Sequence, residues 1–302
     1  MCDEDTARDA QAFIDQRFVT DAQPISRRRF AGMTGAVTAT AGAAALLTPE
    51  LASASPLVES DVLITTPDGE ADCYFVHPAQ GKQAGVLVWP DVLGLREAYR
   101  LMGKRLAAAG YAVLVVNPYY RQAKAPVVAP GASFQDPAVR ERVIPFARAL
   151  TPTTNVTDAK AFVGFLDAQP NVDQTRKIGT TGYCMGGSMT MRTAAALPDR
   201  VGAGASFHGG RLVTDADDSP HLLVESMQAR FLFAIAENDD ERAPQVKTVL
   251  RETFAKAELD AEIEVYDGAL HGWCTIDSQV YNEVQAEKAW ERLTTIFGEA
   301  LA

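Results

Sequence analysis

The sequence is poor in the residues that metal centres and disulfide-rich folds require. Its 302 residues contain four cysteines and four histidines, and neither C-x-x-C nor H-E-x-x-H occurs. The sequence therefore predicts no disulfide framework and no metal site. Basic residues are outnumbered by acidic ones, 28 against 39, so the formal net charge is −11. This charge argues against nucleic acid and against an anionic membrane surface as partners.

The first 54 residues do not have the pattern of a folded domain. The run S-R-R-R-F at 26–30 precedes a weakly apolar stretch at 33–47, and A-S-A follows at 52–54. This pattern resembles a bacterial twin-arginine export signal. The apolar stretch is short and low in Leu, Ile and Val, so no stable membrane anchor is expected.

We therefore divide the chain into a signal at 1–54 and a single domain at 55–302. The twin-arginine route carries folded proteins, so the resemblance implies that the export machinery is a partner and that the protein acts in the periplasm or is secreted. The alternative is a cytoplasmic protein with an Ala-rich tail.

Short apolar runs alternate with helical patterns after residue 60. Residues 85–89, 111–116 and 231–236 are typical of buried strands, and helical spacing follows in segments such as 98–109. This alternation predicts an α/β fold with a mainly parallel sheet and helices on both faces. The stretch from Tyr119 to Pro137 is polar, proline-rich and without periodicity, which favours an active-site loop or cap.

The segment Gly182-Tyr183-Cys184-Met185-Gly186 has the G-x-S-x-G shape of a nucleophile elbow, with cysteine in place of serine. A predicted strand precedes it and a predicted helix follows. If the elbow forms, Cys184 is the nucleophile of an acyl-transfer enzyme. A glycine-rich turn around a buried structural cysteine is the alternative.

A cysteine nucleophile needs a base, and the base needs an orienting group. Asp239 follows one predicted strand and His271 follows the next, so both are expected at the carboxyl edge of the sheet. The order Cys184, Asp239, His271 is that of α/β hydrolases. Asp240 is a weaker candidate than Asp239. A solvated turn or helix cap at the aspartates and an ordinary loop histidine remain alternatives.

Two backbone N–H groups are candidates for an oxyanion hole. One belongs to Met185, which directly follows the nucleophile at a helix start, where the helix dipole also favours a thiolate. The other is expected in the loop after strand 85–89, and we assign it to Val92. His208-Gly209-Gly210 resembles a lipase oxyanion motif but follows the nucleophile, so we expect it to shape the pocket or the local turn instead.

These motifs together resemble the dienelactone hydrolase family. The resemblance covers G-Y-C-M-G-G at 182–187, W-P-D-V-L-G-L at 89–95, N-P-Y-Y-R at 117–121, A-E-N-D-D at 236–240 and H-G-W at 271–273. It implies an α/β-hydrolase fold, a Cys184-His271-Asp239 triad, and cleavage of a small ester or lactone through an acyl-cysteine without a cofactor. Tyr183 and Trp273 are expected to support the site or contact the substrate.

Two departures from the family pattern concern the substrate. Asp91 stands where the resemblance implies a glutamate that holds the resting thiol. Arg121 matches one of two arginines that bind a substrate carboxylate, whereas Thr275 stands at the second position. The family chemistry is therefore expected on a different acyl compound.

Other functions remain open. The same residues suit a general carboxylesterase or thioesterase acting on small acyl groups. Cys274 lies three residues after His271, so a disulfide with Cys184 that switches the enzyme off is a second possibility. A hydrolase-like binding protein without activity is the third.

Overall fold

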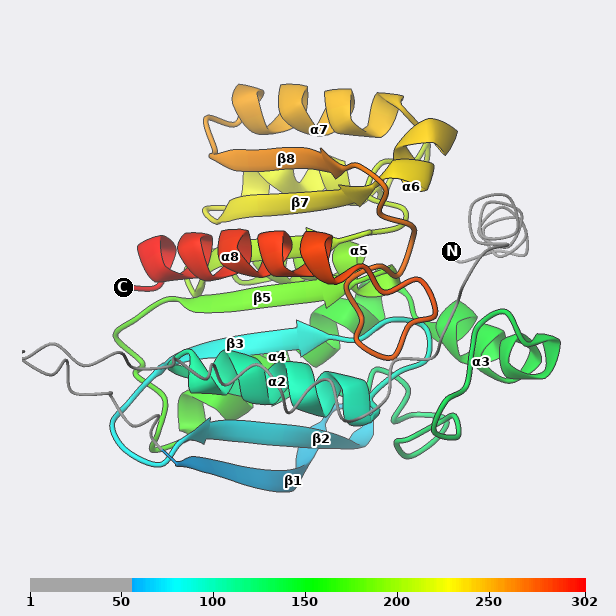
Figure 1. The fold of residues 1–302 in the computed structure, drawn as a ribbon. Helices are drawn as coiled ribbons and strands as arrows, with labels where there is room; N and C mark the ends of the chain where they lie inside the picture. The colour runs from blue at the N-terminus through cyan, green and yellow to red at the C-terminus, as the bar shows by residue number, and fades with distance from the viewer. Residues whose placement is uncertain (1–55) are drawn as a thin grey trace, which may run out of the picture.

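An eight-stranded sheet runs through the centre of the protein in the computed structural model, which describes residues 56–302 (Figure 1). The strand order is β1-β2-β4-β3-β5-β6-β7-β8. The pairs β1–β2 and β2–β4 are antiparallel. The remaining neighbours in this order, β4–β3, β3–β5, β5–β6, β6–β7 and β7–β8, are parallel. The strands are β1 (Leu57–Thr66), β2 (Gly69–Pro78), β3 (Ala84–Trp89), β4 (Tyr111–Val115), β5 (Ile178–Tyr183), β6 (Val201–Phe207), β7 (Arg230–Ala236) and β8 (Ala261–Tyr266).

The prediction of a mainly parallel sheet is confirmed. The export signal predicted at residues 1–54 lies outside the described residues, and so does the start of the predicted domain at residue 55.

Helices cover both faces of the sheet. α2 and α8 pack on the face that is in front in Figure 1, and α4, α5 and α7 pack on the other. Along β3, Val86 and Val88 point into the core beneath α2 and α8, whereas Leu87 and Trp89 point into the core beneath α4, α5 and α7. Successive strand residues point to opposite faces, which explains why this short run is entirely apolar. The helices are α2 (Glu97–Ala108), α3 (Pro137–Ala149), α4 (Pro152–Ala168), α5 (Met185–Ala196), α6 (Glu237–Arg242), α7 (Gln245–Lys256) and α8 (Glu283–Ala300), and Pro220–Ser226 forms a 3-10 turn.

The sequence did not predict α3 and α6. α3 begins where the predicted loop ends, at Pro137, and the side chain of Asp136 caps it by accepting from the N–H of Ala138 at 2.9 Å. Its apolar side chains pack with Tyr119 and Val92 in a third, smaller core instead of on the sheet. α6 has six mostly charged residues and no apolar period to reveal it.

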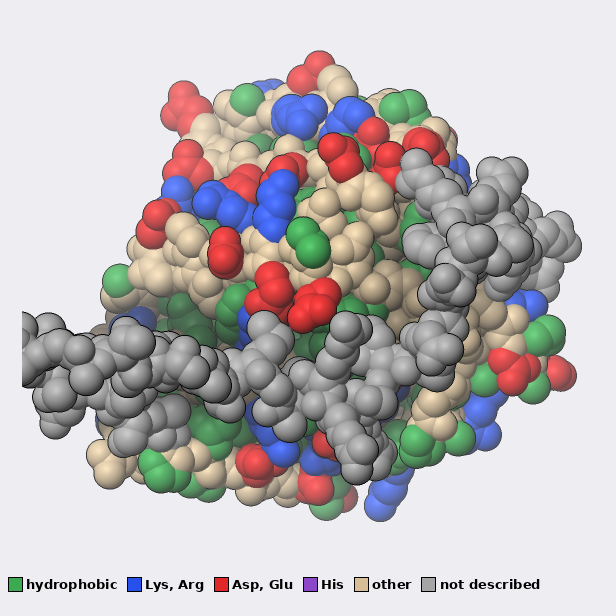
Figure 2. Space-filling model, viewed as in Figure 1, with side chains coloured by type: hydrophobic (Ala, Val, Ile, Leu, Met, Phe, Trp, Pro, Cys, Tyr) green, Lys and Arg blue, Asp and Glu red, His purple; other side chains and the backbone are tan. Residues whose placement is uncertain are grey.

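Acidic and basic side chains are interspersed over β8 and α8 (Figure 2). Lys288 pairs with Glu264, and Arg292 pairs with Glu262, which joins α8 to the edge strand of the sheet. Charged side chains along an edge strand discourage pairing with another sheet. Among residues 56–302, no helix is both long and apolar enough to cross a membrane.

Candidate active site

Cys184 lies in a sharp turn between β5 and α5. Its backbone has φ 54° and ψ −115°, a conformation that residues with a side chain rarely adopt. A Cβ on Gly182 would lie 2.0 Å from the carbonyl oxygen of Gly186, and one on Gly186 would lie 2.4 Å from that of Trp89. Because only glycine fits at both positions, β5, α5 and the end of β3 approach closely. The turn has the form of the predicted nucleophile elbow.

Backbone hydrogen bonds fix this turn on β6. The N–H of Cys184 donates to the carbonyl of Phe207 at 3.1 Å, and the carbonyl of Cys184 accepts from the N–H of Gly210 at 3.1 Å. The side chain of Cys184 is 3% exposed and lines a pocket. The strained turn therefore presents the thiol to an enclosed space and not to bulk solvent.

Asp239 and His271 meet at the carboxyl edge of the sheet, beside Cys184. Asp239 lies in the first turn of α6, directly after β7, and His271 lies in the loop after β8. Nδ1 of His271 is 2.7 Å from Oδ2 of Asp239, and the N–H of His271 donates to Oδ1 of Asn238 at 2.9 Å. The side chain of His271 also hydrogen-bonds that of Cys184. The structure thus brings together the three residues that the sequence predicted as a catalytic group.

The neighbouring aspartate is placed differently. Asp240 forms an ion pair with Lys247 of α7. The preference for Asp239 over Asp240 agrees with this geometry.

The charges at His271 and Asp239 stabilise each other. Burial alone would lower the pKa of His271, but the nearby Asp239 and Cys184 outweigh it and raise this pKa well above 6.5. Burial would raise the pKa of Asp239, but the charge and hydrogen bond of His271 lower it below 3.8. An imidazolium beside a carboxylate is therefore the favoured state of this pair.

The two N–H groups predicted to bind an oxyanion lie beside the pocket. Val92 lines it from the loop after β3, and Met185 is the first residue of α5. Within residues 56–302, neither of these two N–H groups donates a hydrogen bond to a loop or cap carbonyl. The hydroxyl of Tyr119 donates to the carbonyl of Val92 at 2.9 Å and helps to fix that loop.

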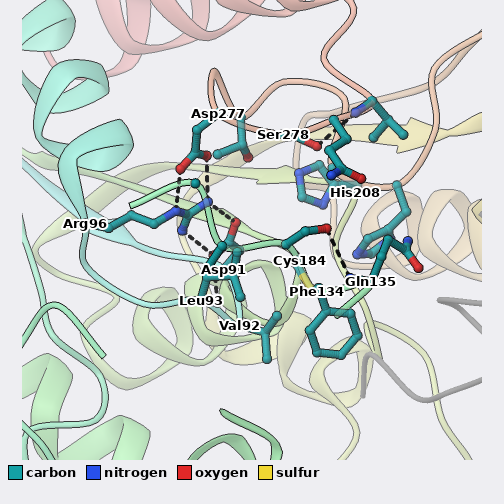
Figure 3. Close-up of a pocket in the computed structure, with 18 residues that line it drawn as sticks. Asp91, Val92, Leu93, Arg96, Phe134, Gln135, Cys184, His208, Asp277 and Ser278 are labelled. Carbon is teal, nitrogen blue, oxygen red and sulfur yellow. Dashed lines mark hydrogen bonds and ion pairs between the residues drawn. The ribbon is translucent and has the colours of Figure 1, made fainter. Parts of the chain in front are cut away.

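The pocket has a volume of about 120 Å³ and is lined from three directions (Figure 3). The β3–α2 loop contributes residues 91–93 and 96, the segment before α3 contributes 131–135, and the β8–α8 loop contributes 271, 272, 275 and 277–280. Part of the stretch 119–137, for which an active-site loop or cap was predicted, thus lines the same pocket as Cys184 and His271. Among residues 56–302, no group of three or more His, Cys, Asp and Glu side chains is arranged to hold a metal ion.

Sequence reasoning missed an ion-pair cluster on one side of this pocket (Figure 3). Arg96 donates to both carboxylate oxygens of Asp91, at 2.7 and 3.0 Å, and to both of Asp277, at 2.7 and 2.8 Å. Oδ1 of Asp91 also accepts from the N–H of Leu93 at 2.9 Å. Both oxygens of Asp91 therefore hold Arg96 and its own loop, in contrast to the role of holding the thiol that the resemblance implied. In the sequence, the only sign of this cluster was that Arg96 follows an apolar run. Nothing in the sequence marked Asp277 as its partner.

The structure does not bring Arg121 to this pocket, which corrects its predicted role as a substrate-binding residue. Its guanidinium pairs with Asp158 and Asp68, each at 2.6 Å. The side chain of Asp158 is fully buried and requires a cation, so it holds Arg121 against α4. Arg121 is absent from the pocket lining, whereas Thr275, at the other predicted arginine position, is part of it.

Tyr183 and Trp273 support the site from behind. Tyr183 stacks on Phe207 with ring centroids 5.0 Å apart, and Trp273 stacks on Tyr266 with centroids 4.8 Å apart. Both are buried and neither lines the pocket. The sequence left open whether these two residues support the site or contact the substrate, and the geometry favours support.

His208 lines the pocket beside His271, in accord with the expectation that its motif shapes this space. Among residues 56–302 no disulfide forms between the cysteines. Cys274 is buried outside the pocket lining, and burial raises the pKa of its thiol well above 9. A buried thiol of this kind reacts slowly in disulfide exchange, which disfavours the redox switch.

Comparison with known proteins agrees with this architecture. The model of the "Dienelactone hydrolase family" matches residues 71–301. A protein of Synechocystis sp. named "Putative carboxymethylenebutenolidase" is 26% identical over 245 residues, covering 78% of this chain and 95% of the relative. A protein of the same name from Methylorubrum extorquens is 28% identical over 251 residues, covering 81% and 82%.

Solved structures share the fold. The crystal structure titled "Putative Dienelactone Hydrolase" from Klebsiella pneumoniae has a TM-score of 0.70 at 21% identity, covering 81% of this chain and 99% of that one. A dienelactone hydrolase structure from Anabaena variabilis has a TM-score of 0.56 at 18% identity, covering 82% and 99%. With an elbow, a partly buried acid–histidine pair and a family match over most of its length, the chain belongs to the dienelactone hydrolase family and is an α/β hydrolase of that type.

Proposed function

We propose that this hydrolase cleaves a small ester or lactone through an acyl-cysteine intermediate, with Cys184, His271 and Asp239 as its catalytic triad. The observation that supports this best is the hydrogen-bonded series from Asp239 through His271 to Cys184, which ends at a strained elbow facing a pocket. Nucleophile, base and orienting group in mutual contact are the parts that covalent acyl transfer requires.

At rest the thiol proton lies on His271, so Cys184 is a thiolate beside an imidazolium, and in the acylation step the sulfur of Cys184 attacks the carbonyl carbon. Asp239 holds the imidazole in position and stabilises the imidazolium. The oxygen of the tetrahedral intermediate accepts from the N–H groups of Met185 and Val92, and the N-terminus of α5 adds its dipole. The intermediate collapses, the carbon–oxygen bond to the leaving group breaks, and His271 protonates the departing oxygen.

In the deacylation step, water replaces the alcohol. His271 takes a proton from the water, and the hydroxide attacks the thioester carbon. The same two N–H groups bind the oxyanion, and the acid leaves as the carbon–sulfur bond breaks, which restores the thiolate while the proton taken from water stays on His271. The acidic product and the free enzyme result without any cofactor in this scheme.

The test is Cys184→Ala, assayed with p-nitrophenyl esters and with an unsaturated lactone. We expect turnover to fall at least about 10³-fold, while circular dichroism and thermal denaturation remain those of wild type. Cys73→Ala, on β2 and outside the pocket lining, is the matched cysteine control. Mass spectrometry of wild type quenched during turnover is expected to find the acyl mass on the peptide that contains Cys184. Unchanged turnover in Cys184→Ala would refute the proposal.

We further propose that residues 1–54 direct twin-arginine export, a proposal supported by the sequence alone. Replacing Arg27 and Arg28 together by lysine should leave the protein in the cytoplasm, whereas wild type should appear outside it. Equal distribution of the two proteins after cell fractionation would contradict export by this route.

A further inference from the structure

Arg96 is the only lysine or arginine among the described residues that line the pocket, and its hydrogen-bonding capacity is fully used. A guanidinium has five N–H donors. Nε and one Nη2 proton bind Asp277, the other Nη2 proton and one Nη1 proton bind Asp91, and the second Nη1 proton binds the carbonyl of Gly94 at 3.2 Å. No donor of Arg96 remains for a substrate.

The charge of this cluster is unfavourable for an anion. Asp91 and Asp277 contribute two negative charges against the single positive charge of Arg96, whose side chain is only 9% exposed. The imidazolium of His271 is already paired with Asp239. A substrate carboxylate would lose its hydration in this pocket and gain no cationic partner, which is costly.

His208 offers the opposite kind of contact. It is 1% exposed, its backbone has φ 39°, and its ring lies edge-on to that of His271 with centroids 4.8 Å apart. Neither ring nitrogen hydrogen-bonds another described residue. Like Cys184, His208 lines the pocket (Figure 3). Buried polar groups are nearly always hydrogen-bonded, so the pocket that holds the nucleophile also holds an unused polar group.

The imidazole of His208 is neutral. Burial, assisted by the neighbouring His271, lowers its pKa well below 6.5. A neutral imidazole has one N–H donor and one acceptor nitrogen. Such a group suits an ether, hydroxyl or carbonyl oxygen better than a carboxylate, which needs a positive partner when it is buried.

We propose that the pocket selects esters whose acyl part is uncharged and carries a polar oxygen, and that His208 hydrogen-bonds this oxygen. The assignment rests on the proposed acyl-cysteine function and narrows its substrate class. His208 then acts as a specificity-determining residue that contacts the substrate, and the cluster around Arg96 excludes anionic acyl groups.

The first test uses two esters of equal shape, p-nitrophenyl methoxyacetate and p-nitrophenyl butyrate, which differ by one oxygen in place of a methylene. For wild type and His208→Phe, the ratio of kcat/KM for methoxyacetate to that for butyrate is compared, so that intrinsic reactivity cancels. We expect the ratio to fall about tenfold in His208→Phe, since one hydrogen bond is lost. His208→Asn, which keeps a donor and an acceptor and tolerates a left-handed backbone, should restore most of it.

An equal loss with both esters would show that His208 only positions His271, and would overturn the proposal. Near-ultraviolet circular dichroism establishes that each variant is folded. If His208→Phe does not fold, the ratio in His208→Asn is compared with that in His208→Leu.

The second test concerns charge. Wild type should hydrolyse p-nitrophenyl hydrogen adipate at least about tenfold less efficiently than its neutral methyl ester, since the acid has no cationic partner. Asp277→Ala removes one carboxylate and frees two donors of Arg96, so the acid-to-ester ratio should rise about tenfold. Asp260→Ala, at an exposed ion pair with Arg230, is the matched charge control and should leave the ratio as in wild type. A wild-type preference for the acid, or an unchanged ratio in Asp277→Ala, would overturn the proposal.

These results separate the substrate class from the function. Turnover of every ester by Cys184→Ala at the wild-type rate would refute the acyl-cysteine function. An inactive Cys184→Ala together with unchanged ratios in the His208 and Asp277 variants would refute only the substrate class.

Discussion

Nδ1 of His271 lies 2.7 Å from Oδ2 of Asp239, whereas Asp240, the next residue, forms an ion pair with Lys247 of α7. This difference between adjacent carboxylates gives a matched experiment. Asp239→Asn should lower kcat/KM for p-nitrophenyl esters at least about 10²-fold, because the base loses its orienting group. Asp240→Asn should remain within about twofold of wild type. Equal losses in the two variants would contradict the role of Asp239.

The same pair predicts a pH dependence. In wild type, His271 stays protonated above pH 6.5, so the alkaline limb of kcat/KM lies above that value. Asp239→Asn removes the charge that raises the pKa and leaves burial, which lowers it, so the limb should move to lower pH. Nitrogen-15 NMR of labelled histidine rings provides a direct measurement, since the chain has only four histidines. An unmoved titration of His271 would contradict this account.

Linkage gives the corresponding effect on stability. The raised pKa of His271 contributes stability that is complete below about pH 6.5 and is lost as pH rises through the folded-state value. The lowered pKa of Asp239 contributes stability that is present above about pH 4 and is lost as pH falls through its folded-state value. Chemical denaturation across pH should show both losses in wild type and smaller ones in Asp239→Asn.

The glycines of the elbow allow a prediction about folding. Gly186→Ala places a Cβ 2.4 Å from the carbonyl oxygen of Trp89, so it should lower the free energy of unfolding by about 3 kcal/mol or more. Gly164→Ala, at an exposed helical glycine whose added Cβ meets no atom within 4 Å, should instead raise it by about 0.5–1 kcal/mol. Urea denaturation of the two variants measures both effects. A Gly186→Ala protein as stable as wild type would contradict the observed packing.

Arg121 should matter for stability and not for substrate binding. Arg121→Ala leaves the buried carboxylate of Asp158 without its cation and should cost about 3 kcal/mol, the lower end for a buried pair because Arg121 is 16% exposed. Asp68→Asn removes its 43% exposed partner and should cost less than about 1 kcal/mol. KM for neutral esters should stay within about twofold in both variants. A raised KM without loss of stability would return Arg121 to the substrate site.

Much of this arrangement follows from local sequence patterns. Apolar runs indicate buried strands, and the order of Cys184, Asp239 and His271 after three of them predicts that they meet at one edge of the sheet. The glycines around Cys184 reveal the elbow because the turn itself excludes a side chain.

What remained hidden depends on tertiary contacts. Arg121 could be assigned to a substrate only by its motif, since its partner Asp158 lies 37 residues away in sequence. Arg96 and Asp277 are separated by 181 residues and meet only when two loops fold over the pocket. The unused nitrogens of His208 are likewise a property of its surroundings, which no residue pattern displays.

The contact between Gly186 and the carbonyl of Trp89 has a consequence for sequence variation. It brings the main chain at the start of α5 against the end of β3, and the hydroxyl of Tyr119 adds contacts to the carbonyl of Val92 and the sulfur of Met185. Val92 takes part in this arrangement through its main chain, so the residue type at 92 is open to exchange as long as the side chain packs. Position 186 is not, because any side chain there would separate α5 from β3.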